Sequence, residues 1–234
     1  GTGCASQGSR EVGVRRALFV VSDRGNGHRV RCGALAAELQ GRGWECAYES
    51  RPVGEAPRGT SVVVMDMGEE EPEVPDGGGA RFVCIRDVGD SGPLSADLYV
   101  NGNAGALSIA GEMRALCGPD YALLRLVFRE ARIIMSEDDG ARNRRRNGTF
   151  DARHIEGVSG YGVAGAMSDA AEIITYGGMR ALEAACILGP SELRRLHIEP
   201  RNEGERLNAE GLQAGAVVDG LGCQRVADAI EALL

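Results

Sequence analysis

Short apolar runs separated by glycine-rich turns mark the first half of the chain. The run Arg16–Ser22 (RALFVVS) follows charged residues and precedes a glycine turn, as is typical of a buried parallel strand. After the turn at Asp23–His28, apolar residues recur at helical spacing over Val30–Leu39. A strand, a glycine loop and a helix in this order predict the start of a βαβ unit. Further strands are predicted at Glu45–Tyr48, Ser61–Asp66, Arg81–Ile85 and Asp97–Val100.

After Arg125 the alternation of strand and helix patterns begins again. The predicted strands are Ile133–Ser136, Ala152–Glu156, Glu172–Tyr176 and Ala216–Asp219. The predicted helices are Gly162–Ala170, Met179–Leu188, Glu203–Ala214 and Cys223–Leu234. Strands that alternate with helices throughout a chain are typical of an α/β protein with mostly parallel sheets. Two such series predict two Rossmann-like domains, at residues 15–126 and 127–234, after a Gly- and Ser-rich flexible tail at 1–14.

The composition narrows the class of protein. The chain has 234 residues, of which 43% are hydrophobic and 26% charged, and these values suit a globular protein rather than a disordered one. The net charge of −8 argues against a nucleic-acid partner and against a membrane surface as a partner. All 26 basic residues are arginine, so Schiff-base lysines, P-loop lysines and kinase lysines are excluded.

The sequence indicates neither a metal site nor a bound cofactor. The seven cysteines are scattered without a C-x-x-C pair, and the three histidines lie too far apart to suggest metal-ligand spacing. No apolar run approaches the ~18 residues of a membrane span. A signal-peptide pattern is also missing. We therefore expect a cytoplasmic protein.

The loop after the first strand has the sharpest chemical feature. Gly25-Asn26-Gly27 starts like a dinucleotide fingerprint, but Val30 occupies the place of the third glycine, so the pattern is weak evidence for NAD. A tight loop at a helix N-terminus exposes backbone N–H groups and favours anions. His28 lies on this loop, where the carboxyl ends of parallel strands form a ligand crevice. His28 either caps the helix or takes part in chemistry. Cys32, four residues later, either forms a nucleophile pair with His28 or packs beneath the helix.

Further polar residues lie at other strand ends. Gly177 and Gly178 separate a predicted strand from a helix that contains Glu183. This pattern suits a diphosphate on the helix N-terminus with a sugar hydroxyl on the carboxylate, and it equally suits an ordinary helix start with a solvated Glu. Asp66 ends an apolar strand, where it faces the crevice or caps the next turn. The polar loop at 199–205 contains Asn202.

Taken in order, these segments resemble one family of enzymes. The family is that of the hydrolases that cleave UDP-2,4-diacetamido-2,4,6-trideoxy-β-L-altropyranose in pseudaminic acid biosynthesis, with their spore-coat polysaccharide relatives. The segments that carry the resemblance are Gly25–Cys32 (GNGHRVRC), Asp97–Ala106 (DLYVNGNAGA), Gly118–Arg125 (GPDYALLR), Gly177-Gly178 with Glu183, and Asn202 with Asn208-Ala209. The resemblance implies a glycosyltransferase-B-type fold, in which the active site lies in the cleft between two Rossmann-like domains.

The resemblance also implies an activity and a set of site residues. The reaction is hydrolysis of a UDP-linked amino sugar by attack of water at the anomeric carbon, with inversion and without metal or cofactor. The implied catalytic residues are His28, which deprotonates the water, and Asn202. The residues implied to bind the nucleotide are Gly27, Gly177, Gly178 and Glu183. Those implied to contact the substrate are Asp66, Asn103 and Tyr121.

Departures from the family pattern keep two other functions open. Met67-Gly68-Glu69 follows Asp66 where the family has an aromatic residue, usually Tyr. The segment Met135–Asp138 replaces a glycine-rich motif and adds two negative charges, which repel a diphosphate. The family's Asn-Gln is Asn202-Glu203 here. The alternatives are a glycosyltransferase on the same fold and a non-catalytic protein that binds a nucleotide sugar.

Overall fold

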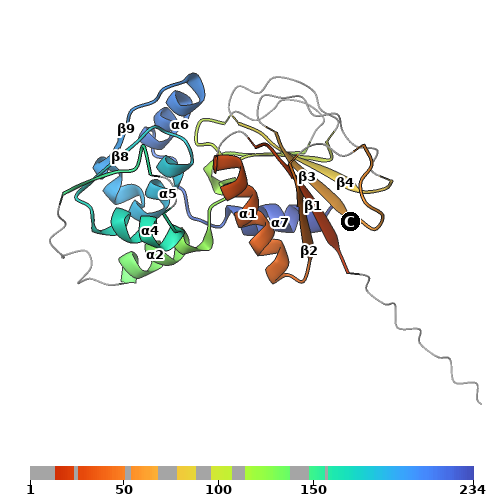
Figure 1. Cartoon of the computed structure of the whole chain (residues 1–234). Coiled ribbons are helices and arrows are strands. Elements are labelled where there is room, and N and C mark those ends of the chain that lie inside the picture. Colours follow the sequence, from red (N-terminus) through yellow and green to blue (C-terminus); the bar gives the residue numbers. More distant parts are fainter. Residues whose placement is uncertain are drawn as a thin grey trace, which may run out of the picture.

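The larger sheet of the molecule has six strands, all parallel, in the order β2-β1-β3-β4-β5-β6 (Figure 1). The computed structural model describes residues 14–23, 26–50, 54–67, 78–87, 96–106, 114–137, 148–155 and 158–234. The strands are β1 (Arg16–Val21), β2 (Glu45–Glu49), β3 (Val62–Asp66), β4 (Arg81–Ile85), β5 (Leu98–Asn101) and β6 (Ala115–Cys117). Every residue of β3 and nearly every residue of β1 is buried. Their unbroken apolar runs therefore reflect a parallel sheet whose central strands are covered on both sides.

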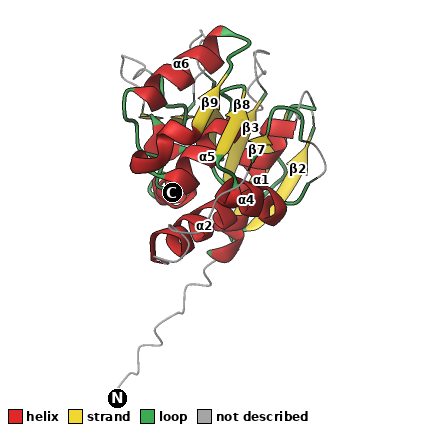
Figure 2. Ribbon diagram, turned by 90° about the vertical axis from the view of Figure 1, so that its left-hand side faces the viewer, coloured by secondary structure: helices red, strands yellow, loops and turns green. Residues whose placement is uncertain are grey.

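A second, smaller parallel sheet has three strands in the order β7-β8-β9 (Figure 2). These strands are β7 (Thr149–Asp151), β8 (Glu172–Thr175) and β9 (Leu196–Ile198). The helices are α1 (Asn26–Gly41), α2 (Leu126–Glu137), α4 (Gly160–Asp169), α5 (Met179–Leu188), α6 (Glu203–Gln213) and α7 (Gly222–Glu231), with short 3₁₀ helices η1 (Pro119–Tyr121) and η2 (Pro190–Arg195). The α/β class with Rossmann-like parallel sheets is thus confirmed.

Each sheet has its own hydrophobic core. In the larger one, α1 and α7 lie side by side on one face of the sheet (Figure 1). The residues that fill this core include Phe19, Val64 and Val83 from the strands, Leu35 and Leu39 from α1, and Val226 and Ile230 from α7. In the smaller one, α5 is buried along its length among α2, α4 and β8. The last helix of the chain therefore contributes to the core of the first sheet. The limits of the two expected domains stay a prediction.

The first half was predicted closely, but parts of the second half were not. The strand expected at Ile133–Ser136 is wrong, because these residues lie in α2. In that helix Phe128, Ala131 and Met135 face the core at helical spacing, whereas Ile134 is exposed. The short apolar run is one turn of an amphipathic helix.

Two further expected strands need correction. Ala216–Asp219 forms no strand; the Val218 carbonyl accepts a hydrogen bond from Arg132 Nη1 (2.6 Å) instead of a ladder partner. The strand expected at Ala152–Glu156 is also wrong, because β7 covers Thr149–Asp151, immediately before it, and a turn follows at Arg153 and His154; Glu156 itself lies outside the described residues. The flexible tail expected at 1–14 also lies outside them, except for the exposed Val14.

Candidate functional site

The order of the strands marks one point on the edge of the larger sheet. From β1 the chain passes through α1 to β2 on one side, whereas β3 pairs with β1 on the other side. In an open parallel sheet, ligands bind outside the carboxyl ends of the strands at such a reversal of strand order. Here the first turn of α1 follows β1 and contains His28, and Asp66 is the last residue of β3. The topology therefore brings these two residues to the position where a ligand is expected.

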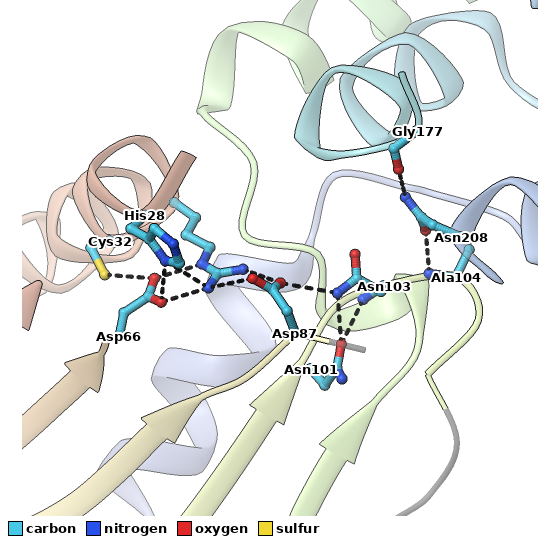
Figure 3. A network of polar contacts seen from close by, with 10 residues as sticks. His28, Cys32, Asp66, Asp87, Asn101, Asn103, Ala104, Gly177 and Asn208 are labelled. Atoms are coloured by element: carbon cyan, nitrogen blue, oxygen red, sulfur yellow. Dashed lines mark hydrogen bonds and ion pairs between the residues drawn. The ribbon is translucent and has the colours of Figure 1, made fainter. Parts of the chain in front are cut away.

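The Asp66 carboxylate is the centre of this cluster (Figure 3). It is 0% exposed and accepts hydrogen bonds from Arg31 Nε and Nη2, both at 2.5 Å, while its Oδ1 lies 2.6 Å from His28 Nδ1. Burial alone would raise the pKa of Asp66, but the hydrogen bonds and charge of Arg31, with the contact to His28, lower it to about 2. Asp66 is therefore an anion at neutral pH.

The contacts of His28 determine which of its ring nitrogens carries a hydrogen. An ionised Asp66 can only accept, and Arg31 Nη2, 3.1 Å from Nδ1, can only donate. A contact of 2.6 Å between Nδ1 and the carboxylate therefore requires the hydrogen to be on Nδ1. In a neutral imidazole this leaves the lone pair on Nε2, which has no hydrogen-bond partner within the described residues. The side chain is 18% exposed, so the imidazole is partly accessible at the sheet edge.

The thiol of Cys32 belongs to the inner side of the same cluster. Its Sγ lies 3.4 Å from Asp66 Oδ2 and is buried in the core of the larger sheet. Burial and the Asp66 carboxylate raise the pKa of Cys32 well above its usual range. A thiol in this state is a poor nucleophile. Of the two interpretations of Cys32, the structure therefore favours packing beneath α1.

A chain of polar contacts continues from Arg31 along the sheet edge (Figure 3). Arg31 Nη1 donates to Asp87 Oδ1 (2.5 Å), just beyond β4, and Asn103 Nδ2 donates to the same oxygen (3.2 Å). Asn103 Nδ2 also donates to Asn101 Oδ1 (2.9 Å) at the end of β5. Both amide hydrogens of Asn103 are thus used, which fixes the orientation of the amide. Its Oδ1 points away from these contacts (Figure 3).

The Gly177–Gly178 turn connects β8 to α5. Gly177 has φ +105°, and a Cβ there would lie 2.7 Å from the carbonyl oxygen of Glu205, so only glycine fits. Gly178 is the N-cap of α5 and supplies no side-chain cap. The first amide groups of α5 therefore have no side-chain acceptor from their own N-cap residue.

The remaining predicted residues lie outside the His28 cluster. Glu183 is 1% exposed and accepts from Arg125 Nη2 (2.9 Å) and Arg180 Nη1 (2.6 Å), so both carboxylate oxygens are paired. Asn202 is the N-cap of α6 and accepts from the amide of Glu205 (2.9 Å).

Two of the predicted residues make fewer contacts. Tyr121 in η1 packs against the core of the larger sheet. Gly27 lies exposed in the first turn of α1, and a Cβ there would meet nothing within 4 Å. The space beside Gly27 leaves room for a ligand, but nothing about the residue itself selects one.

Arg31, Asp87 and Asn208 are functional candidates to which the sequence analysis gave no role. Arg31 lies one helical turn after His28, and Asp87 follows β4 much as Asp66 ends β3. Asp87 could have been found from its position, because acidic residues follow two neighbouring parallel strands. The negative charge of Asp87 could then have pointed to a basic partner such as Arg31. Asn208 belongs to a segment that carries the family resemblance, but its role could not be read from the sequence, because its partners are backbone groups far away in the chain.

Comparison of the chain with family models, with curated proteins and with solved structures finds no match. In the described segments, no three His, Cys, Asp or Glu side chains are placed together as a metal site would require. No helix there is long and apolar enough to cross a membrane.

Proposed function

We propose that the chain is a metal-independent, inverting hydrolase of a UDP-linked amino sugar, of the pseudaminic acid type, on a glycosyltransferase-B-like architecture. The observation that carries the proposal is the His28–Asp66 pair at the reversal of strand order. Asp66 holds the Nδ1 hydrogen of His28, which leaves Nε2 of a neutral imidazole with its lone pair, on a side chain that is 18% exposed. An imidazole in this state is suited to act as a general base.

In the proposed reaction, His28 Nε2 removes a proton from water while the water oxygen attacks the anomeric carbon of the sugar. The bond between that carbon and the diphosphate oxygen breaks, and its electron pair leaves with UDP. The imidazolium that forms is stabilised by the Asp66 carboxylate, 2.6 Å from Nδ1. The products are UDP and the free sugar with inverted configuration. UDP needs little acid assistance if backbone amides stabilise its charge.

The other predicted site residues fit around this step. The N-terminus of α5, with Gly177 and Gly178, is the proposed position of the diphosphate, because helix N-termini attract anions. Asn103 Oδ1 would accept a hydrogen bond from a hydroxyl or acetamido N–H of the sugar.

For some residues the proposed role is changed by their contacts. Asp66 orients His28 rather than touching the sugar, because it is fully buried and its oxygens are already paired. Glu183 supports the start of α5 through Arg125 and Arg180. Its contact with the ribose, and the contacts of Asn202, Tyr121 and Gly27 with substrate, remain predictions.

The test is a proton NMR time course with UDP-2,4-diacetamido-2,4,6-trideoxy-β-L-altropyranose in the presence of a chelator. We expect the parent to release UDP and free sugar, and His28→Ala to be slower by roughly 10²–10⁴-fold. His197→Ala is the matched control, because His197 is exposed on β9 and outside the cluster. Equal rates for the parent and His28→Ala would contradict the proposal.

The same experiment separates the two alternatives. Release of UDP only when an acceptor alcohol is added would indicate a glycosyltransferase, in which His28 takes the proton of the acceptor instead of water. Binding of the UDP-sugar without turnover under either condition would indicate a non-catalytic binding protein. Because Met67 follows Asp66 where the family has an aromatic residue, binding without turnover would be consistent with the loss of that aromatic side chain.

A further inference from the structure

A single buried side chain connects the ends of strands from the two sheets. Asn208, on α6, is 1% exposed. Its Oδ1 accepts a hydrogen bond from the amide of Ala104 (2.7 Å), beyond β5, and its Nδ2 donates to the carbonyl of Gly177 (2.5 Å), beyond β8 (Figure 3). The candidate site at the edge of the larger sheet and the Gly177–Gly178 turn are therefore joined through one amide group.

The two partners of Asn208 require an amide at this position. The amide of Ala104 needs an acceptor and the carbonyl of Gly177 needs a donor, so the orientation of the Asn208 side chain is fixed. A carboxylate of the same size would keep the first hydrogen bond and place two acceptors against each other at Gly177. An apolar side chain would leave both backbone groups without their partner.

The backbone of α6 lies directly against the same two strand ends. A Cβ on Gly105 would be 2.3 Å from the carbonyl oxygen of Leu207, and one on Gly211 would be 2.4 Å from that of Ala104. On the other side, a Cβ on Gly177 would meet the carbonyl of Glu205 at 2.7 Å. Helix α6 is thus in backbone contact with both strand ends, and Asn208 faces the junction between them.

We infer that Asn208 is a positioning residue that fixes the Gly177–Gly178 turn, and with it the N-terminus of α5, relative to Asn103. This inference rests on the proposed function, in which one ligand places its diphosphate at α5 and its sugar at the edge of the larger sheet. Both ends can be bound at once only when their separation matches the ligand. Because a misplacement of about 1 Å can cost about 10²-fold in rate, the amide of Asn208 determines how well the ligand is aligned with His28.

The discriminating variant is Asn208→Asp. It replaces the amide NH₂ group, which donates to the Gly177 carbonyl, by a carboxylate oxygen, which can only accept. We expect faster amide hydrogen exchange in peptides that cover Asn103–Ala106 and Gly177–Met179, with peptides of α1 unchanged. We also expect the dissociation constant for UDP, measured by calorimetry, to rise about tenfold or more, and kcat with the UDP-sugar to fall. Asn208→Ala, which removes both hydrogen bonds without adding a charge, replaces it if the Asp variant does not fold.

The matched control is Gln213→Glu on the same helix. It makes the same change of an amide to a carboxylate, but at an exposed position at the end of α6. Exchange at Gly177–Met179 should therefore equal that of the parent.

Three results would decide against the inference or its premise. Unchanged hydrogen exchange at both segments in Asn208→Asp would show that Asn208 does not hold the two strand ends, and would overturn the inference. Faster exchange with UDP affinity and kcat equal to those of the parent would show that Asn208 has only a structural role, and would overturn its role in positioning the ligand. If the parent itself binds no UDP, the proposed function fails and the inference loses its ligand, while the exchange result still decides whether Asn208 holds the turn.

Discussion

At the scale of single residues, the Asp66 carboxylate holds together the groups that make His28 useful. It is fully buried, and it is shared by Arg31, His28 and the thiol of Cys32. Removal of one partner of a buried charged pair leaves the other without compensation. Asp87 contacts the same Arg31, but its side chain is 44% exposed, so water can replace it.

This difference leads to a comparison of two variants. Asp66→Asn is expected to lower the free energy of unfolding by about 3 kcal/mol, because Arg31 loses its buried counter-charge. Asp87→Asn should cost about 1 kcal/mol or less, as for an exposed pair. Denaturant unfolding at neutral pH measures both. Equal losses for the two variants would mean that burial does not determine the strength of this cluster.

The low pKa of Asp66 also predicts how stability depends on pH. The pKa is about 2 in the folded protein, and about 3.9 in an unfolded chain. The folded state therefore favours the ionised form, and its stabilisation of about 2–3 kcal/mol is present above pH 4 and is lost as the pH falls towards 2. The stability difference between the parent and Asp66→Asn should shrink over this range. A difference that stays constant from pH 6 to pH 2.5 would contradict the assignment.

The residues of the candidate site were predictable to different degrees. His28 and Asp66 could be identified because each lies at the end of an apolar run in a βαβ pattern, and the structure brings them into contact. Glu183 was expected at a ribose, yet it pairs with Arg125, which lies 58 residues earlier. No local pattern connects two such residues, because their contact depends on the packing of α2 against α5.

At the scale of elements, the turn before α5 offers two neighbouring glycines with different requirements. Gly177 has φ +105° and no room for a Cβ, whereas Gly178 has φ −80° and open space around it. Gly177→Ala is expected to destabilise the protein by about 1–3 kcal/mol through strain, and to displace the start of α5. Gly178→Ala should leave the free energy of unfolding within about 0.5 kcal/mol of the parent. Thermal and denaturant unfolding test this, and the opposite order would show that the turn has another conformation.

The elements of the larger sheet were predicted better than those of the smaller one for a physical reason. Its central strands are buried on both faces, so they form continuous apolar runs that stand out from the flanking turns. Strands β7 and β9 of the smaller sheet have three residues each, as does β6 at the edge of the larger one. Three residues are too few for a pattern to show. The run at Ile133–Ser136 was misread because its period becomes clear only over the whole of α2.

At the scale of the whole molecule, two cores are connected at several places. In the segment 122–124, Leu123 packs into the core of the larger sheet, whereas Ala122 and Leu124 pack into the other core. Helix α7 then returns to the larger sheet, and Gly222 at its start lies against the backbone of Ala122, where a Cβ would be 2.2 Å from the carbonyl oxygen. These contacts join the two cores directly.

Because of these connections, we expect the two cores to unfold together. Ile230 on α7 is fully buried in the first core and Leu182 on α5 is buried in the second. Each change to Ala should cost about 2–5 kcal/mol and should lower the midpoint of one common thermal transition. Ile134→Ala, at an exposed position of α2, is the control and should change stability by less than about 0.5 kcal/mol.

Calorimetry distinguishes the two possible outcomes. A calorimetric enthalpy equal to the van't Hoff enthalpy, in the parent and in both core variants, would agree with a single cooperative unit. Two resolved transitions, one shifted by Ile230→Ala and the other by Leu182→Ala, would contradict it. Such independence would also weaken the role of Asn208, because a side chain that fixes two strand ends relative to each other requires that the cores bearing them stay together.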